Sequence, residues 1–136
     1  GLIIGNAYTI TGLTENTNYT IHIEAVDAAG NRSMASLTNL RTNSNPTSLI
    51  TGSLSGDRPF NYALSGTSSS DSDVGDAIST YSWSINGVYL SNNSAVNGTL
   101  TTPGIHTFAL QVSDSRDGVS AVAVAVVTVT IDAVAP

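Results

Sequence analysis

Short runs in which every second residue is apolar recur along this chain, and they constrain its fold more than any other feature. Residues 78–85 and 105–113 are the clearest cases, with apolar positions at Tyr81, Trp83, Ile85, Phe108, Leu110 and Val112. A period of two residues places such side chains on one face of a β-strand. Clusters of Gly, Asn, Asp and Pro separate the runs, and none has helical periodicity. The sequence therefore predicts an all-β protein, with Trp83 as a core anchor.

The pattern divides the chain into two parts. The first is expected to hold three strands, over residues 7–13, 18–26 and 36–42. The second is expected to hold seven, over residues 47–53, 59–66, 78–85, 87–90, 94–100, 105–113 and 118–131. Residues 43–46 are interpreted as a linker, because Pro46 favours an extended chain and has no N–H for a sheet ladder. The predicted domains are therefore 1–42 and 47–132, and residues 133–136 are expected to link to a following module.

Composition excludes several classes of protein. Four Lys and Arg against ten Asp and Glu give a net charge of −6, which argues against partners with a phosphate backbone and against anionic membrane surfaces. The chain has no cysteine, so it has neither disulfides nor thiol chemistry. No stretch approaches the roughly 20 apolar residues of a membrane helix. We therefore expect no nucleic-acid partner and no membrane insertion.

A corner motif marks the first part of the chain. Leu13, Thr17 and Tyr19 stand in the stretch LTENTNY. This stretch resembles the L-x-P-x-T-x-Y corner of fibronectin type III domains, with Glu15 where proline is usual. The resemblance implies that the Tyr19 hydroxyl bonds to the backbone a few residues upstream.

Only part of such a domain is present. Residues 1–42 resemble its C-terminal half, with DAAGNRS at 27–33 as the turn before the last strand. A complete sandwich needs about 100 residues, and half of one would expose its core face and an unpaired edge. Either residues upstream of Gly1 or another chain would supply the missing strands. We favour upstream continuation of the same chain.

Three segments mark the second part. They are a Ser- and Asp-rich turn at 65–73, a Y-x-W strand at 78–83 and a strand that follows Pro-Gly within 101–115. Together they resemble a PKD domain, an immunoglobulin-like sandwich of many extracellular proteins, over roughly residues 45–132. The expected fold is thus all-β, with tandem immunoglobulin-like β-sandwiches, the first incomplete because its first strands are missing.

Three aspartates within six positions form the candidate metal site. Asp71, Asp73 and Asp76 lie in DSDVGD, and calcium prefers several hard oxygen ligands. Some PKD domains bind calcium at this turn with an Asn near the domain start, which implies Asn45, Asp71 and Asp73 as ligands here. The alternative is that Asp side chains bond nearby backbone N–H groups and stabilise the turn without metal. Gly75 fits both interpretations.

No catalytic motif is found. Carboxylates on one turn are spaced for a cation, whereas glycosidases place two across a cleft. His22 is expected on the outward face of its strand, and His106 as a partly buried packing residue. Asp117-Gly118 predicts a hairpin turn, with Arg116 projecting into solvent. We expect no enzymatic activity and no cofactor other than calcium.

The run AVAVAVVTVT at 121–130 is apolar on both faces of its strand. Such a strand is buried on both sides or contacts a neighbouring module, so the expected partners are neighbouring sandwich modules or identical subunits. A surface polysaccharide is a further candidate partner, for which Tyr89 is the best exposed aromatic.

The sequence predicts a non-catalytic spacer module of an extracellular or cell-surface protein of adhesin, filament or surface-layer type. The alternative is an accessory region of a secreted enzyme that degrades polysaccharide or protein, with weak carbohydrate binding.

Overall fold

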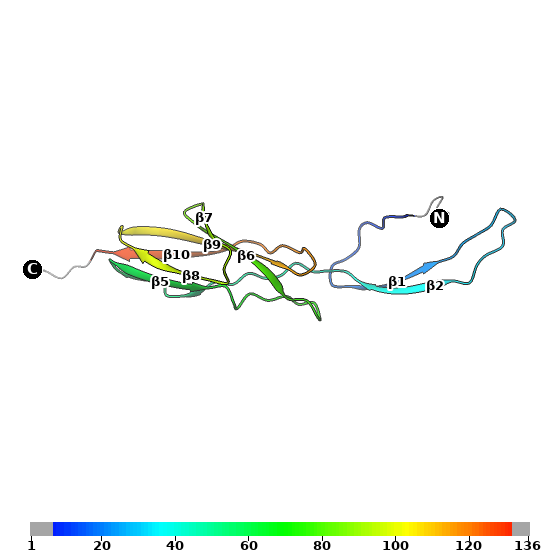
Figure 1. Ribbon diagram of the computed structural model, residues 1–136, viewed down its shortest axis with the longest axis horizontal. Coiled ribbons are helices and arrows are strands. Elements are labelled where there is room, and N and C mark those ends of the chain that lie inside the picture. Colours follow the sequence, from blue (N-terminus) through cyan, green and yellow to red (C-terminus); the bar gives the residue numbers. More distant parts are fainter. Residues whose placement is uncertain (1–6, 132–136) are drawn as a thin grey trace, which may run out of the picture. The chain divides into compact units, whose positions relative to one another are not determined.

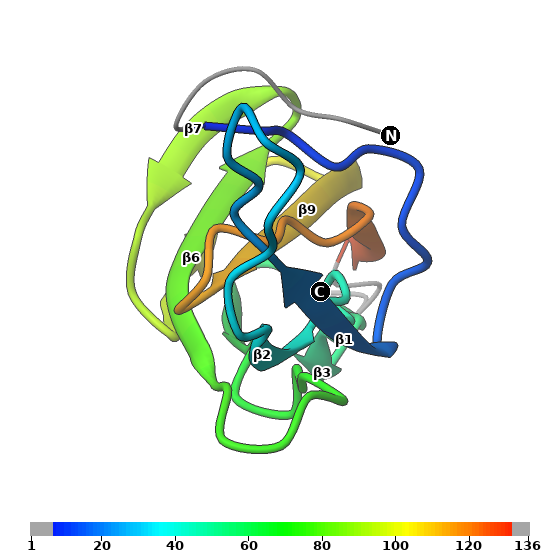
Figure 2. The ribbon, with the colours of Figure 1, turned by 90° about the vertical axis from the view of Figure 1, so that its right-hand side faces the viewer.

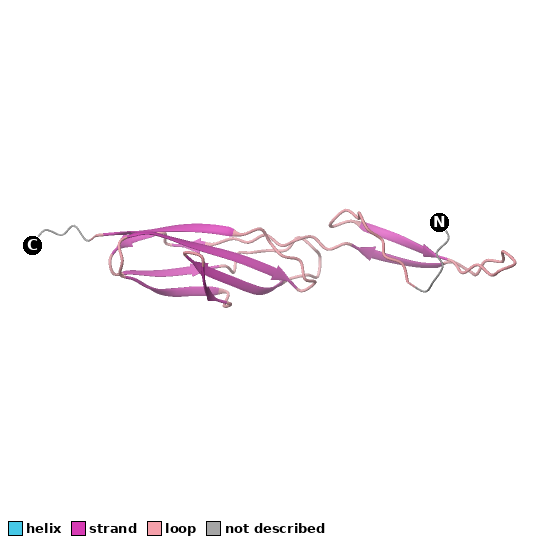
Figure 3. Ribbon diagram, turned by 90° about the horizontal axis from the view of Figure 1, so that it is seen from above, coloured by secondary structure: helices cyan, strands magenta, loops and turns pink. Residues whose placement is uncertain are grey.

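The computed structural model describes residues 7–131. All regular elements in that part of the chain are β-strands (Figure 3), which confirms the predicted all-β class. The described residues contain no helix with the length and apolarity needed to cross a lipid bilayer. The chain divides into two compact units, Gly1–Ser44 and Asn45–Pro136, called unit 1 and unit 2 below.

Unit 1 is built on one antiparallel pair, β1 (Asn18–Ile23) and β2 (Ser36–Arg41) (Figure 1). Both strands match their predicted positions. The predicted strand over residues 7–13 is wrong, because these residues are irregular. A β-strand needs a partner for its backbone groups, and no described segment of unit 1 pairs with this one.

Two features hold the ends of this hairpin. The Thr14 N–H donates to the Tyr19 hydroxyl at 2.9 Å, which confirms the predicted tyrosine corner. At the other end, Asp27 Oδ1 accepts the N–H groups of Ala29 and Asn31, each at 2.9 Å. The segment 27–33 is therefore the expected turn, and an Asx side chain stabilises it.

Unit 2 is a sandwich of two sheets. Its strands are β3 (Thr51–Gly52), β4 (Ser55–Asp57), β5 (Phe60–Ser65), β6 (Ile78–Ile85), β7 (Val88–Ser91), β8 (Ala95–Leu100), β9 (Gly104–Asp114) and β10 (Ala123–Thr130). One sheet has the order β4-β10-β9-β6-β7 and the other β3-β5-β8. In the five-stranded sheet β6 lies beside β9 (Figure 2). Strand β4 pairs with β10 in parallel, whereas the other pairings are antiparallel.

The core lies between the two sheets and uses the alternating residues that the sequence pattern picked out. Its largest fully buried side chains are Trp83, Phe108, Leu64, Leu110, Val112 and Val127. The Trp83 indole Nε1 donates to the Asn93 carbonyl at 2.9 Å, so the tryptophan satisfies its one polar atom inside the core. The rings of Tyr62 and Phe108 meet at a centroid distance of 4.8 Å.

Of the strand predicted over residues 47–53, only Thr51–Gly52 forms a strand, β3. Strand β4 has no counterpart in the prediction. Strand β3 belongs to the three-stranded sheet, while β4 belongs to the five-stranded sheet. Gly52, the last residue of β3, has φ of 140°, and a Cβ there would lie 2.3 Å from the Ala63 carbonyl oxygen. Glycine therefore lets the chain leave one sheet and join the other. The β4 sequence SGD lacks apolar alternation, so the pattern could not show it.

Strand β10 buries one face only. Ala125, Val127 and Val129 point into the core, while Val124 and Val126 are exposed. No described residue of unit 2 covers the outer face of this strand, so burial on both sides within unit 2 is wrong. Contact of this face with another module remains a prediction.

Candidate metal centre

The three aspartates lie on the loop between β5 and β6. Backbone bonds between Thr47 and Ser70 tie this loop to the start of unit 2, at 2.8 and 3.0 Å. Gly75 has φ of 80°, which allows the sharp turn that brings Asp76 back toward the aspartates before it. The Asp76 N–H donates to the Asp73 carbonyl at 3.1 Å and closes this turn.

Asp71, Asp73 and Asp76 each offer one carboxylate oxygen, and these atoms lie within 4.8 Å of one another. Asp73 is buried and the other two residues are half-buried. Asp71 Oδ1 accepts the Asp73 N–H at 2.6 Å, while Asp71 Oδ2 is buried and has no hydrogen-bond donor. The turn-stabilising bond and a set of converging carboxylates are therefore both present.

Asp76 joins this loop to the β9–β10 turn. Its Oδ1 accepts the N–H of Ala77 at 2.8 Å and the N–H of Ser115 at 3.1 Å, and it also accepts the Ser115 hydroxyl. Its Oδ2 lies 3.5 Å from Arg116 Nε. The Ser115 hydroxyl above all lowers the pKa of Asp76 below its ordinary value of 3.8, against the opposing effect of desolvation. Asp76 is therefore ionised at neutral pH.

The β9–β10 turn is the expected Asp-Gly hairpin turn. Asp117 has φ of 68°, and the buried Asp114 carboxylate accepts the N–H groups of Arg116 and Gly118 at 2.7 and 2.8 Å. Arg116 does not simply project into solvent, because its guanidinium pairs with Asp76. This pairing could not be predicted from the sequence, since forty positions separate the two residues.

Asn45 has a hydrogen-bonding role of its own. Its amide Oδ1 accepts the Val119 N–H at 3.3 Å, so it holds the start of unit 2 to the segment before β10. The structure thus brings Asp76 together with Asp71 and Asp73. The placing of Asn45 among the ligands stays a prediction.

The chemistry of this loop suits a hard divalent cation. All three converging groups are carboxylates, the buried Asp71 Oδ2 has no hydrogen-bond donor, and Arg116 forms an ion pair with Asp76. Calcium takes oxygen ligands of this kind, with carboxylates and backbone carbonyls in flexible geometry. The residues present therefore fit calcium, with Asp71 Oδ2 as the first candidate ligand atom.

The same geometry is poorly suited to acid–base catalysis. Glycosidase carboxylates lie about 5 to 10 Å apart on opposite sides of a bound sugar, whereas these three share one turn. The two histidines lie in different units. His22 is exposed, 3.4 Å from Glu24 Oε1, and His106 is half-buried with Nε2 2.9 Å from the Thr102 carbonyl. Both placements agree with the expectations for these residues.

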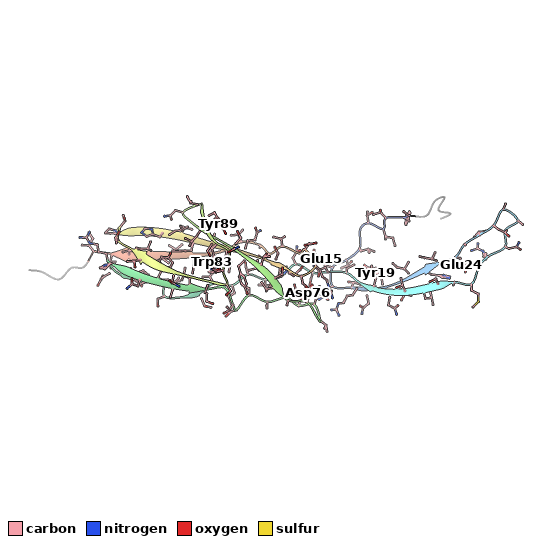
Figure 4. The ribbon with its side chains drawn as sticks, viewed as in Figure 1. Glu15, Tyr19, Glu24, Asp76, Trp83 and Tyr89 are labelled. Carbon is pink, nitrogen blue, oxygen red and sulfur yellow. The ribbon has the colours of Figure 1, made fainter. Side chains whose placement is uncertain are left out.

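The two aromatic candidates occupy different environments in unit 2. Trp83 is fully buried, as predicted, while Tyr89 on β7 is 65% exposed (Figure 4). A shallow hollow of about 290 Å³ borders Tyr89 on the outer face of the five-stranded sheet.

The two facing sheets make unit 2 an immunoglobulin-like β-sandwich, and unit 1 has the tyrosine corner found in such folds. No protein-family model matches the sequence, and no curated protein matches it either. Among solved structures, the PKD1 domain of Vibrio anguillarum Epp is similar with a TM-score of 0.55 and 19% identity, over 65% of this chain and 98% of that one. The PKD domain of an M14-like peptidase from a Thermoplasmatales archaeon is similar with a TM-score of 0.50 and 19% identity, over the same shares.

A fibronectin type III-like structure is also among the similar solved structures. The fibronectin(III)-like modules of Clostridium thermocellum CbhA are similar with a TM-score of 0.55 and 17% identity, over 93% of this chain and 69% of that one. Both resemblances noted in the sequence, to PKD and to fibronectin type III domains, are therefore confirmed at the level of the fold.

Proposed function

We propose that this chain is a non-catalytic spacer of a modular protein outside the cell, where it holds distance between other parts. The observation that carries the proposal is the pairing of β4 with β10, which come first and last along the chain among the strands of the five-stranded sheet. Strand β4 runs parallel to β10, with Thr128 opposite Ser55 and Thr130 opposite Asp57. The Thr128 N–H donates to the Leu54 carbonyl at 2.8 Å, and the Arg58 N–H to the Thr130 carbonyl at 3.0 Å.

This pairing suits a load-bearing module. A pull on the two ends of unit 2 draws β4 and β10 in opposite directions along their length. The hydrogen bonds between two parallel strands are then loaded together, whereas an antiparallel hairpin pulled open at one end loses them one at a time. The core between the sheets would fail only after these bonds break, so the unit keeps its length under tension.

Force spectroscopy on the whole chain tests this proposal. We expect one cooperative rupture for unit 2, which releases residues 45–131, about 300 Å when fully extended, less the folded end-to-end distance. Extension of these residues in many small steps, or without a force peak, would contradict the spacer role.

A second candidate function is an accessory role beside a secreted hydrolase. One similar structure is a PKD domain of a peptidase, and this favours the alternative specifically. The sequence of the complete gene that encodes this chain distinguishes the two roles. Further sandwich modules and a surface anchor favour the spacer of an adhesin, filament or surface layer, while a hydrolase domain favours the accessory role.

We also propose that Asp71, Asp73 and Asp76 bind calcium, with Asn45 as the further candidate ligand. A cation that binds only the folded state raises its stability in proportion to the logarithm of its concentration. We expect the melting temperature to rise in millimolar calcium and to fall in chelator, with a smaller response in Asp71→Asn. Identical melting curves in both buffers would leave the aspartates as turn-stabilising residues only.

A further inference from the structure

The outer face of the five-stranded sheet carries a hollow that neither the spacer role nor the aspartate loop uses. Three strands form it in register: Ser84 pairs with Tyr89 on β7 and with Ala109 on β9, and Ser82 pairs with Gln111. Trp83, between the two serines, points into the core. The hollow is therefore built mainly on the sheet face, and Gly87 of the β6–β7 turn and Val122 just before β10 complete its lining.

The lining groups combine one aromatic ring with uncharged polar groups. Tyr89 is 65% exposed, Ser84 lies opposite it on β6, and Ser82 lines the same hollow two residues earlier on that strand. Gln111 Nε2 donates to the Ser120 carbonyl at 3.0 Å. Because this bond uses the amide nitrogen, it fixes the side chain and leaves Oε1 to accept a hydrogen bond.

The charge pattern restricts the ligand. None of the residues that line the hollow is charged, and the polar ones are Ser82, Ser84, Tyr89 and Gln111. The chain as a whole carries −6, which disfavours anionic ligands. The volume of about 290 Å³ is at the lower end of small-molecule sites, and the hollow is open to solvent along the sheet.

We infer that this hollow binds a segment of a neutral polysaccharide. A sugar ring has an apolar face that can lie against an exposed tyrosine, and hydroxyls that exchange hydrogen bonds with Ser and Gln side chains. An uncharged site accommodates such a ligand without leaving a buried charge unpaired. An open hollow lets a polymer continue past it in both directions. The site adds a binding activity to the spacer role and does not depend on that role.

Affinity electrophoresis in native gels tests the inference. The probes are three neutral polysaccharides, hydroxyethyl cellulose, glucomannan and xylan, with anionic polygalacturonate as the comparison. We expect at least one neutral polymer to retard the protein, and polygalacturonate not to. Tyr89→Ala should weaken the retarding interaction about tenfold, the upper range for one stacked aromatic ring, while Tyr89→Phe should keep it.

Tyr8 supplies the matched control, because it is 68% exposed in unit 1 and lies outside the hollow. Tyr8→Ala should migrate like the wild type in every gel. No retardation by any of the three neutral polymers would overturn the inference. So would equal retardation by polygalacturonate, or retardation that Tyr89→Ala leaves unchanged. Circular dichroism of each variant confirms that the sandwich is intact, and the force measurement on unit 2 is unaffected by any of these outcomes.

Discussion

Asp76 joins two loops of unit 2 that are far apart in the sequence. Its carboxylate accepts hydrogen bonds from Ala77 and Ser115 and pairs with Arg116. The sequence could predict Asp76 as a neighbour of Asp71 and Asp73 because all three share one short turn. It could not predict Ser115 or Arg116, since only the fold brings the β9–β10 turn beside this loop.

The lowered pKa of Asp76 makes a pH prediction. Its hydrogen bonds favour the ionised form in the folded state, so its contribution to the free energy of unfolding is complete above about pH 5. That contribution is lost as the pH falls below the ordinary value of 3.8 toward the lower pKa of the folded protein. In chelator, the stability difference between wild type and Asp76→Asn should therefore shrink below about pH 4. A difference that stays constant from pH 6 to pH 2.5 would contradict this role.

Tyr19 is the second residue whose role can be isolated. Tyr19→Phe removes the hydroxyl that accepts the Thr14 N–H and keeps the ring. We expect the Thr14 amide to exchange faster with solvent, and the free energy of unfolding of unit 1 to fall by about 0.5 to 1.5 kcal/mol. Hydrogen exchange followed by NMR measures both. Tyr8→Phe is the control, because it should leave Thr14 protection unchanged.

Strand β10 shows that an apolar run predicts a strand but does not show which of its faces is buried. The run at 121–130 correctly predicts a strand, but its sequence does not show which face is buried, because valines stand on both. The pairing with β9, with Val127 opposite His106 and Val126 opposite Thr107, fixes that choice. Strand β4, by contrast, is held by backbone bonds to β10 and has no side-chain pattern to find.

Two neighbouring valines of β10 test this assignment. Val127 is fully buried and Val126 is 47% exposed. Val127→Ala should lower the free energy of unfolding of unit 2 by about 2 to 3 kcal/mol, because it leaves a cavity in the core. Val126→Ala should change it by less than about 0.5 kcal/mol. Equal losses in urea unfolding would mean that a neighbour covers the outer face of β10.

In the proposed spacer role, unit 2 keeps its length under tension because a pull on its ends loads the β4–β10 pair in shear. The strand pattern predicted the all-β class, but not which strands are loaded first when the two ends of unit 2 are pulled apart. That property depends on the crossing of the chain from β3 to β4 near Gly52. It emerges only when both sheets are assembled.

The most direct test compares two pulling directions on the same unit. The chain has no cysteine, so handles can be attached selectively to introduced ones. Thr47→Cys with Ile131→Cys loads β4 against β10 in shear. Ile105→Cys, at an exposed position of β9, with Ile131→Cys peels β10 from β9, starting near the Ile105–Thr128 pair. We expect a clearly higher rupture force in the first geometry, and equal or reversed forces would contradict a load-bearing β4–β10 pair.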